Sequence, residues 1–159
     1  MHAEAMPQQP AERVRAMLER VLDELELNGE VEISENDDEI VAVVDGDDDY
    51  GLLIGRRGQT IDAVQLLCYQ AAFRGIPERK RVMVDAAGYR ERRRETLERR
   101  ADRAAEQALN LARPVELDAM SAPERRVIHE RLKERPEVET YSEGTEPNRC
   151  VVVAPLLSE

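Results

Sequence analysis

Two glycines enclose two arginines in the segment Gly55-Arg56-Arg57-Gly58. Glycine adopts positive φ angles without steric penalty, so this segment can turn tightly. An apolar helical pattern starts directly after Gly58, and the first amides of such a helix point into the turn without partners. Helix amino termini bind phosphate, and two guanidinium groups add charge and hydrogen-bond donors. The segment therefore predicts a site for a nucleic-acid backbone, with a helix–turn–helix corner bearing solvated arginines as the alternative.

The residues around this turn favour the first interpretation. KH domains hold about four nucleotides through a GxxG loop. The pattern here follows an expected strand and short helix, and it precedes an expected helix and strand. Apolar side chains beside the turn are expected to line a groove for bases: Leu52, Leu53, Ile54, Ile61 and Val64. A P-loop is excluded, because no Gly-Lys-Ser/Thr sequence follows.

A second group of phosphate-binding side chains lies on an expected helix over residues 121–135. At about 100° per residue, Arg125, Arg126, His129 and Lys133 fall within an arc of about 100°. A histidine can donate to a phosphate oxygen in either protonation state, and an arginine one turn earlier can fork the same group. The spacing alone also fits a solvated basic face with a half-buried histidine.

The charge distribution supports both sites, although the chain has a formal net charge of -11. Residues 1–50 carry 3 basic and 16 acidic side chains, whereas residues 51–135 carry 19 basic and 13 acidic ones. Residues 136–159 are again acidic, with 1 basic and 5 acidic side chains. Because salt screens charges beyond about 8–10 Å, the local basic segment matters more than the total. With no Trp and 1 Phe, an extensive aromatic platform for bases is not expected.

The elements that must position these residues are predicted by periodicity. Apolar residues at steps of three and four predict helices at residues 11–27, 59–74, 89–111 and 121–135. Alternating or β-branched runs predict strands at residues 31–33, 40–44, 81–85, 115–117, 138–142 and 149–154. Leu67 and Leu111 are expected on the apolar sides of their helices. The pattern predicts two small α+β units with a boundary near residues 86–88.

Two known domains resemble these units. Residues 11–85 resemble a bacterial KH domain of the type II arrangement, with its extra amino-terminal helix and strand. Residues 115–154 resemble an R-three-H domain, a small module for single-stranded nucleic acid named for an Arg-xxx-His motif, here Arg125 and His129. The pair in this order is similar to the Jag family, also called SpoIIIJ-associated protein, KhpB or EloR. Many members carry a further amino-terminal Jag domain, whereas this chain is expected to open directly on the KH helix.

The polar amino terminus, with its two prolines, predicts a disordered tail at residues 1–9. The resemblance implies a KH domain at residues 10–86 and an R-three-H domain at residues 87–159 led by a long basic helix. It implies a cytoplasmic bacterial protein that binds single-stranded RNA without a cofactor or enzymatic activity. Such a protein would act as an RNA chaperone or post-transcriptional regulator linked to cell elongation and envelope growth. A second small KH protein, or a second copy of this chain, is the implied protein partner. The expected RNA-binding residues are Gly55, Arg56, Arg57, Gly58, Arg125, Arg126, His129, Lys133 and Arg149.

Two rival functions remain open at this point. One is a protein-interaction adaptor whose acidic amino-terminal half binds a basic partner, and the other is a module for single-stranded DNA. Asp45, Asp47 and Asp49 resemble the start of a calcium loop, but Arg56 occupies the position of the bidentate glutamate. The histidines and cysteines lack zinc-binding spacing, and no apolar run reaches the roughly 20 residues of a membrane helix, so neither a metal site nor membrane insertion is expected.

Overall fold

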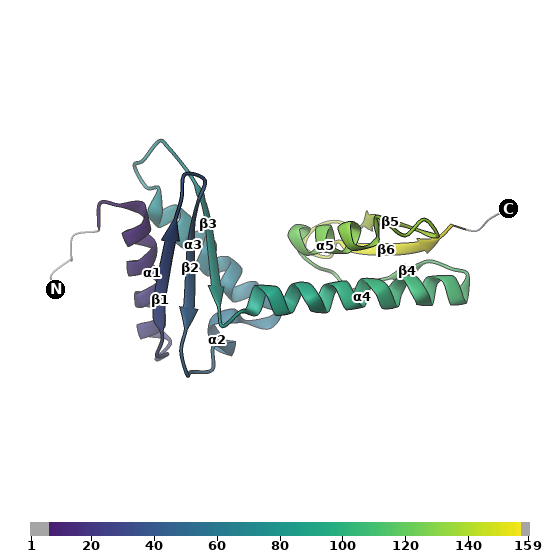
Figure 1. The fold of residues 1–159 in the computed structure, drawn as a ribbon, viewed down its shortest axis with the longest axis horizontal. Coiled ribbons are helices and arrows are strands. Elements are labelled where there is room, and N and C mark those ends of the chain that lie inside the picture. The colour runs from purple at the N-terminus through teal and green to yellow at the C-terminus, as the bar shows by residue number, and fades with distance from the viewer. Residues whose placement is uncertain (1–6, 157–159) are drawn as a thin grey trace. The chain divides into compact units, whose positions relative to one another are not determined.

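The structure, a computed structural model, describes residues 7–156 and divides the chain into two compact units between Arg90 and Glu91 (Figure 1). The sequence placed this boundary near residues 86–88. Most of the tail expected at residues 1–9 lies outside the described residues. Each unit combines helices with one three-stranded sheet, so the α+β prediction is confirmed.

The first unit places two long helices on one side of its sheet. Its elements are α1 (Pro10–Glu24), β1 (Glu30–Glu35), β2 (Glu39–Asp45), α2 (Gly51–Ile54), the 3₁₀ turn η1 (Arg56–Gly58), α3 (Gln59–Ala72) and β3 (Arg81–Ala86). The strand order is β1-β2-β3, with β1 antiparallel and β3 parallel to β2. Helix α1 packs on α3 and β1, and α3 packs on β3. Among the described strands, β3 is therefore an edge strand, and α3 lies against it.

The core of this unit follows from two periodicities. Val14, Leu18 and Leu22 recur at four-residue steps on α1 and are buried, and β2 buries every second residue. The expectation that Leu67 faces the core is wrong, since 53% of this side chain's surface is exposed. The buried residues of α3 occupy an arc bounded by Ala71 and Ala72, and Leu67 falls outside it.

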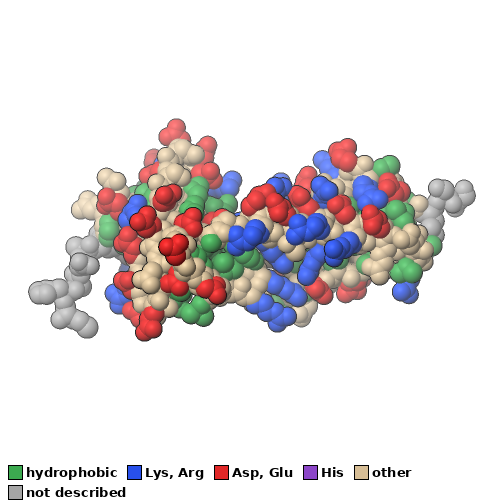
Figure 2. Space-filling view, turned by 60° about the horizontal axis from the view of Figure 1, so that its bottom comes forward, with side chains coloured by type: hydrophobic (Ala, Val, Ile, Leu, Met, Phe, Trp, Pro, Cys, Tyr) green, Lys and Arg blue, Asp and Glu red, His purple; other side chains and the backbone are tan. Residues whose placement is uncertain are grey.

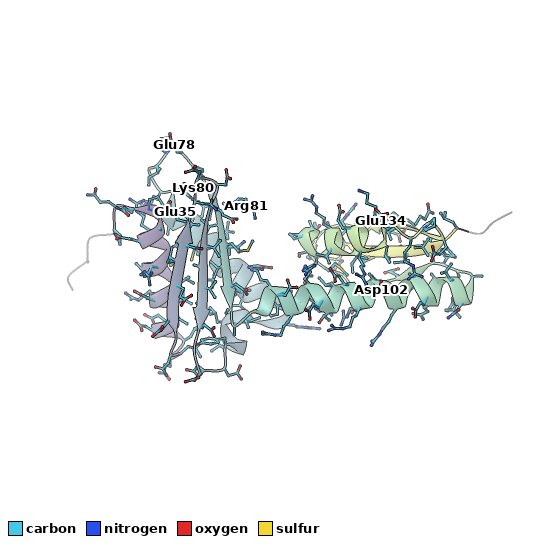
Figure 3. The ribbon with its side chains drawn as sticks, viewed as in Figure 1. Glu35, Glu78, Lys80, Arg81, Asp102 and Glu134 are labelled. Carbon is cyan, nitrogen blue, oxygen red and sulfur yellow. The ribbon has the colours of Figure 1, made fainter. Side chains whose placement is uncertain are left out.

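The other face of the first sheet carries acidic side chains. In the β1–β2 register Glu30 pairs with Asp45, and Glu32 pairs with Val43. Glu30, Glu32 and Asp45 are exposed, in contrast to the residues that alternate with them. At one end of this sheet Lys80 Nζ lies 2.8 Å from Glu35 Oε1, so an ion pair joins the end of β1 to the residue before β3 (Figure 3).

The second unit packs two helices on an antiparallel sheet. Its elements are α4 (Tyr89–Leu111), whose first two residues belong to the first unit, β4 (Val115–Glu116), α5 (Ala122–Leu132), β5 (Val138–Glu143) and β6 (Cys150–Pro155). The strand order β4-β6-β5 makes β6 central and β5 an edge strand. An alanine-rich seam on α4 packs against the core around Ile128 and Val151. Leu111, expected on that seam, is 47% exposed because it closes the helix beyond the core.

Candidate nucleic-acid interface

The Gly55–Gly58 segment forms the tight turn that the sequence predicts. Gly55, Arg57 and Gly58 have φ angles of 73°, 55° and 76°. The Gly58 amide donates to the Gly55 carbonyl over 3.3 Å, which closes the turn directly before α3. No side chain of the described residues caps the amino terminus of α3. The first amides of that helix are therefore available to an anion at the turn.

Both glycines are required by their surroundings as well as by their φ angles. A Cβ atom on Gly55 would overlap Thr60 Oγ1, which lies on the first turn of α3. A Cβ atom on Gly58 would lie 2.7 Å from Cε1 of Tyr89. The ring of Tyr89 thus lies directly against the turn, a contact that no pattern in the sequence indicates. Tyr89 is the first residue of α4, so the start of that helix is anchored at the turn.

The two arginines of the turn differ in exposure, and so do the apolar residues near it. Arg56 is exposed, whereas Arg57 is half-buried. Leu52 is 62% exposed and Ile54 is half-buried, so both can border a groove. The expectation that Leu53, Ile61 and Val64 also line that groove is wrong, because all three are buried in the core of the first unit.

A hydrogen-bonded cluster covers the open edge of β3 beside α3. The Val84 amide donates to Gln65 Oε1 over 2.9 Å, and Arg90 Nε donates to the Val84 carbonyl over 2.7 Å. Arg90 also donates to Gln65 Oε1 over 3.0 Å and pairs with Asp62 Oδ1 at 3.0 Å. Both backbone groups of Val84 are thereby satisfied by side chains rather than by a neighbouring strand. An incoming base or strand would have to displace Gln65 and Arg90 to reach them.

No pattern in the sequence indicated this edge cluster. Asp62, Gln65, Val84 and Arg90 come from three different elements, and only the packing of α3 on β3 brings them together. The strand order β1-β2-β3 explains why the cluster is needed. Among the described strands none pairs with the outer edge of β3, so alternate backbone groups of β3 need other partners.

In the second unit Arg125 is a buried side chain, not a member of an exposed basic face. Arg125 is 7% exposed. Its guanidinium donates to the Met120 carbonyl over 2.8 Å and to Glu146 Oε1 over 2.7 Å. The expected arc of four basic residues is therefore split. Arg126 on α5 and Lys133 directly after this helix are exposed, whereas Arg125 faces the loop after β5.

His129 is half-buried and is held through both ring nitrogens. Nδ1 lies 2.7 Å from Thr140 Oγ1, and Nε2 lies 3.0 Å from Ser142 Oγ. Burial, together with the nearby Arg125 guanidinium, lowers the pKa of His129 below its ordinary value. The imidazole is consequently neutral at pH 7 and engaged within the domain. The sequence indicated His129 but not its two hydroxyl partners.

Arg149, the remaining expected contact, lies in the loop before β6. Its side chain donates to the Gly144 carbonyl over 2.8 Å and is only half-buried. This bond closes the 144–149 loop that also carries Glu146. Contact of any of these residues with RNA stays a prediction.

The arginines of α4 are largely neutralised by acidic neighbours. Arg93 pairs with Glu124 at 2.7 Å, with both side chains mostly buried, and so ties α4 to α5. Arg94 pairs with Glu91 and Glu98 on its own helix. Figure 2 shows Lys and Arg side chains gathered over the unit that contains most of α4, interspersed with acidic ones. The helix is thus less basic toward a ligand than its arginine content indicates.

The part of the chain that the structure describes holds no group of three or more acidic, histidine or cysteine side chains placed to bind a metal ion. None of the described helices has the length and apolar character needed to cross a membrane.

Comparison with known families and proteins covers both units. Residues 11–85 match the KH domain of KhpA and KhpB, and residues 95–155 match the R-three-H domain. A protein of Clostridium symbiosum named RNA-binding protein KhpB is 39% identical over 86% of this chain and 62% of its own length. The protein of the same name from Bacillus subtilis is 31% identical over 91% of this chain and 70% of its own length. A third, from Lactiplantibacillus plantarum, is 41% identical over 65% of this chain but 32% of its own length, so these relatives are longer than this chain.

Proposed function

Because this chain belongs to the KhpB family, with a KH domain of the KhpA/KhpB type ahead of an R-three-H domain, we propose that it binds single-stranded RNA. The observation that carries the proposal is the Gly55–Gly58 turn. Its φ angles place the uncapped amides of α3 beside Arg56 and Arg57, which suits a phosphate group. The names of the relatives, which describe RNA-binding proteins, support RNA over single-stranded DNA as the ligand.

The R-three-H domain supplies the second RNA contact in this proposal. Arg126 on α5 and Lys133 directly after this helix are exposed cations of the domain, and His129 lies on α5. Two weak contacts on one chain raise the overall affinity through effective concentration, even when each alone is modest. We assign no catalytic role, since binding explains the features of both units without a nucleophile or a metal.

The biological setting is also a proposal. We place the protein in the cytoplasm as an RNA chaperone or post-transcriptional regulator linked to cell elongation and envelope growth, following the family resemblance. A second KH protein or a second copy is the partner that we propose for the outward side of α3, where Leu66 and Leu67 are 58% and 53% exposed. Sedimentation of the chain with Leu66→Asp and Leu67→Asp tests the second copy, and an unchanged oligomeric state would reject self-association through this face.

The central test replaces the two turn arginines. We expect Arg56→Asp with Arg57→Asp to weaken binding of a single-stranded RNA at least about ten-fold, because two phosphate contacts become repulsive. The matched control is Arg20→Asp with Arg113→Asp, which changes net charge equally at exposed positions elsewhere. Fluorescence anisotropy with labelled RNA measures both, and circular dichroism verifies folding. Equal affinities for the folded double variant and the wild type would reject the KH contact.

The same assay separates the rival functions. Competition between RNA and DNA of one sequence measures the preference for the sugar, since a module for single-stranded DNA would bind the DNA at least as tightly as the RNA. Crosslinking in cells followed by sequencing tests for bound RNA. Recovery of a stoichiometric basic protein with no crosslinked RNA would instead support the adaptor function.

A further inference from the structure

His129 of the R-three-H domain is bracketed by two hydroxyl groups of one strand. Thr140 and Ser142 are two residues apart on β5, so their side chains lie on the same face of that strand. Thr140 Oγ1 lies 2.7 Å from Nδ1 of the ring and Ser142 Oγ lies 3.0 Å from Nε2. All three residues are half-buried. The imidazole therefore has no ring nitrogen left to offer to a ligand while this arrangement holds.

The hydrogen-bond donors and acceptors of the His129 ring determine which group remains available to a ligand. A neutral imidazole has one N–H donor and one acceptor nitrogen, so one hydroxyl must accept from the ring while the other donates to it. The accepting hydroxyl keeps its own hydrogen. Within the described part of the chain, His129 is the one hydrogen-bond partner of each hydroxyl. In either tautomer, one oriented O–H is thus available at this half-buried position.

We propose that a hydroxyl of Thr140 or Ser142, and not the imidazole of His129, donates a hydrogen bond to a phosphate oxygen of bound RNA. His129 is then a positioning residue that orients the two hydroxyls. Arg126 on α5 and Lys133 directly after it are exposed and supply attraction to the same phosphate backbone, while Arg125 is engaged with Glu146. This inference rests on the proposed RNA-binding function and assigns the contact to two residues of the β5 edge strand.

The test removes the hydroxyls without changing the shape of the side chains. We expect Thr140→Val with Ser142→Ala, in the full chain, to weaken RNA binding about ten-fold, as loss of a hydrogen bond to a charged group does. The matched control is Thr145→Val with Ser121→Ala, which removes two exposed hydroxyls of the same unit. Thr140→Ser with Ser142→Thr keeps both hydroxyls and should retain wild-type affinity. Wild-type affinity in the hydroxyl-free variant would overturn the inference.

A double-mutant cycle separates positioning from direct contact. If His129 acts through the hydroxyls, His129→Gln combined with Thr140→Val and Ser142→Ala should bind RNA no more weakly than the hydroxyl-free variant. If the losses of binding free energy caused by His129→Gln and by the hydroxyl-free variant simply add, the imidazole contacts RNA independently. The ¹⁵N shifts of the ring give a second readout, and they should keep one tautomer when RNA is added. Conversion to a ring that donates from both nitrogens to RNA would overturn the proposal.

These outcomes are distinct from failure of the proposed function. If the wild-type chain binds no single-stranded RNA, the RNA-binding proposal itself fails. If the wild type binds and the hydroxyl-free variant binds equally well, only the assignment to Thr140 and Ser142 fails.

Discussion

Gly58 illustrates how one residue satisfies two separate constraints. Its φ of 76° lies in the left-handed region, and its missing side chain leaves room for the ring of Tyr89. Gly75 has the same φ of 76°, but a Cβ atom there would meet nothing within 4 Å. Comparing substitutions at Gly58 and Gly75 therefore separates the free-energy cost of a positive φ angle from the free-energy cost of a steric clash.

We expect Gly75→Ala to lower the free energy of unfolding of the first unit by about 1 kcal/mol, the usual cost of positive φ for a residue with Cβ. Gly58→Ala should cost at least about 1 kcal/mol more, since the new methyl group must displace Tyr89. Urea unfolding of both variants measures the difference. Equal midpoints would show that Tyr89 does not constrain the turn.

His129 makes the second unit sensitive to acid. Burial and Arg125 lower its pKa in the folded state, so the folded protein binds fewer protons than the unfolded chain near the ordinary histidine pKa of about 6.5. The stability that neutral His129 contributes is present above that pH and is lost as the pH falls below it. Comparing urea midpoints at about pH 7.5 and pH 5.5, we expect the wild type to lose more stability than His129→Gln. A loss of the same size in both proteins would contradict this assignment.

At the scale of the elements, the outer edge of β3 depends on side chains of α3 and α4 for its hydrogen bonds. No described strand pairs with its outer edge, and Gln65 and Arg90 satisfy the backbone groups of Val84 instead. We expect Gln65→Ala to accelerate hydrogen exchange of the Val84 amide at least about ten-fold, because the amide loses its acceptor. The Met83 amide, which faces β2 in the parallel ladder, serves as the internal control. Unchanged protection of Val84 would show that Gln65 is not its acceptor in solution.

The elements themselves were largely predictable from the sequence. The helix expected at residues 11–27 is α1 at Pro10–Glu24, and the strand expected at residues 81–85 is β3 at Arg81–Ala86. Local periodicity suffices for such elements because the spacing of apolar residues along the chain directly determines their buried stripes. The hydrogen bonds and ion pairs between side chains of different elements could not be predicted.

Arg125 is the clearest example of that limit. Helical spacing placed it beside Arg126 on one basic arc, but packing of α5 turns Arg125 toward Met120 and Glu146 while Arg126 stays in solvent. An ion pair with a residue 21 positions away leaves no periodic trace in the sequence. The edge cluster of Asp62, Gln65 and Arg90 escaped prediction for the same reason.

For the whole molecule, the uneven distribution of charge matters more than its sum. Although the net charge is -11, we expect RNA affinity to fall as salt rises, with a slope of about -0.7 in log–log form for each phosphate contact. Replacing Arg56 and Arg57 by Asp should flatten this slope by about 1.4 if each contacts one phosphate. Affinities measured between about 50 and 200 mM salt give both slopes. A slope that is unaltered in the double variant would place the phosphate contacts elsewhere.

The acidic face of the first sheet has a kinetic consequence. Glu30, Glu32 and Asp45 stand exposed on the face opposite α1 and α3, whereas the Gly55–Gly58 turn leads into α3. A polyanion that approaches this face meets repulsion at short range and diffuses away, so unproductive encounters are brief. If RNA binds at the Gly55–Gly58 turn as proposed, we expect encounters on the side of α1 and α3 to last longer than encounters on this acidic face. The acidic side chains of this face thus disfavour the binding of a polyanion there. Removing them would lengthen the lifetime of encounter complexes on this face.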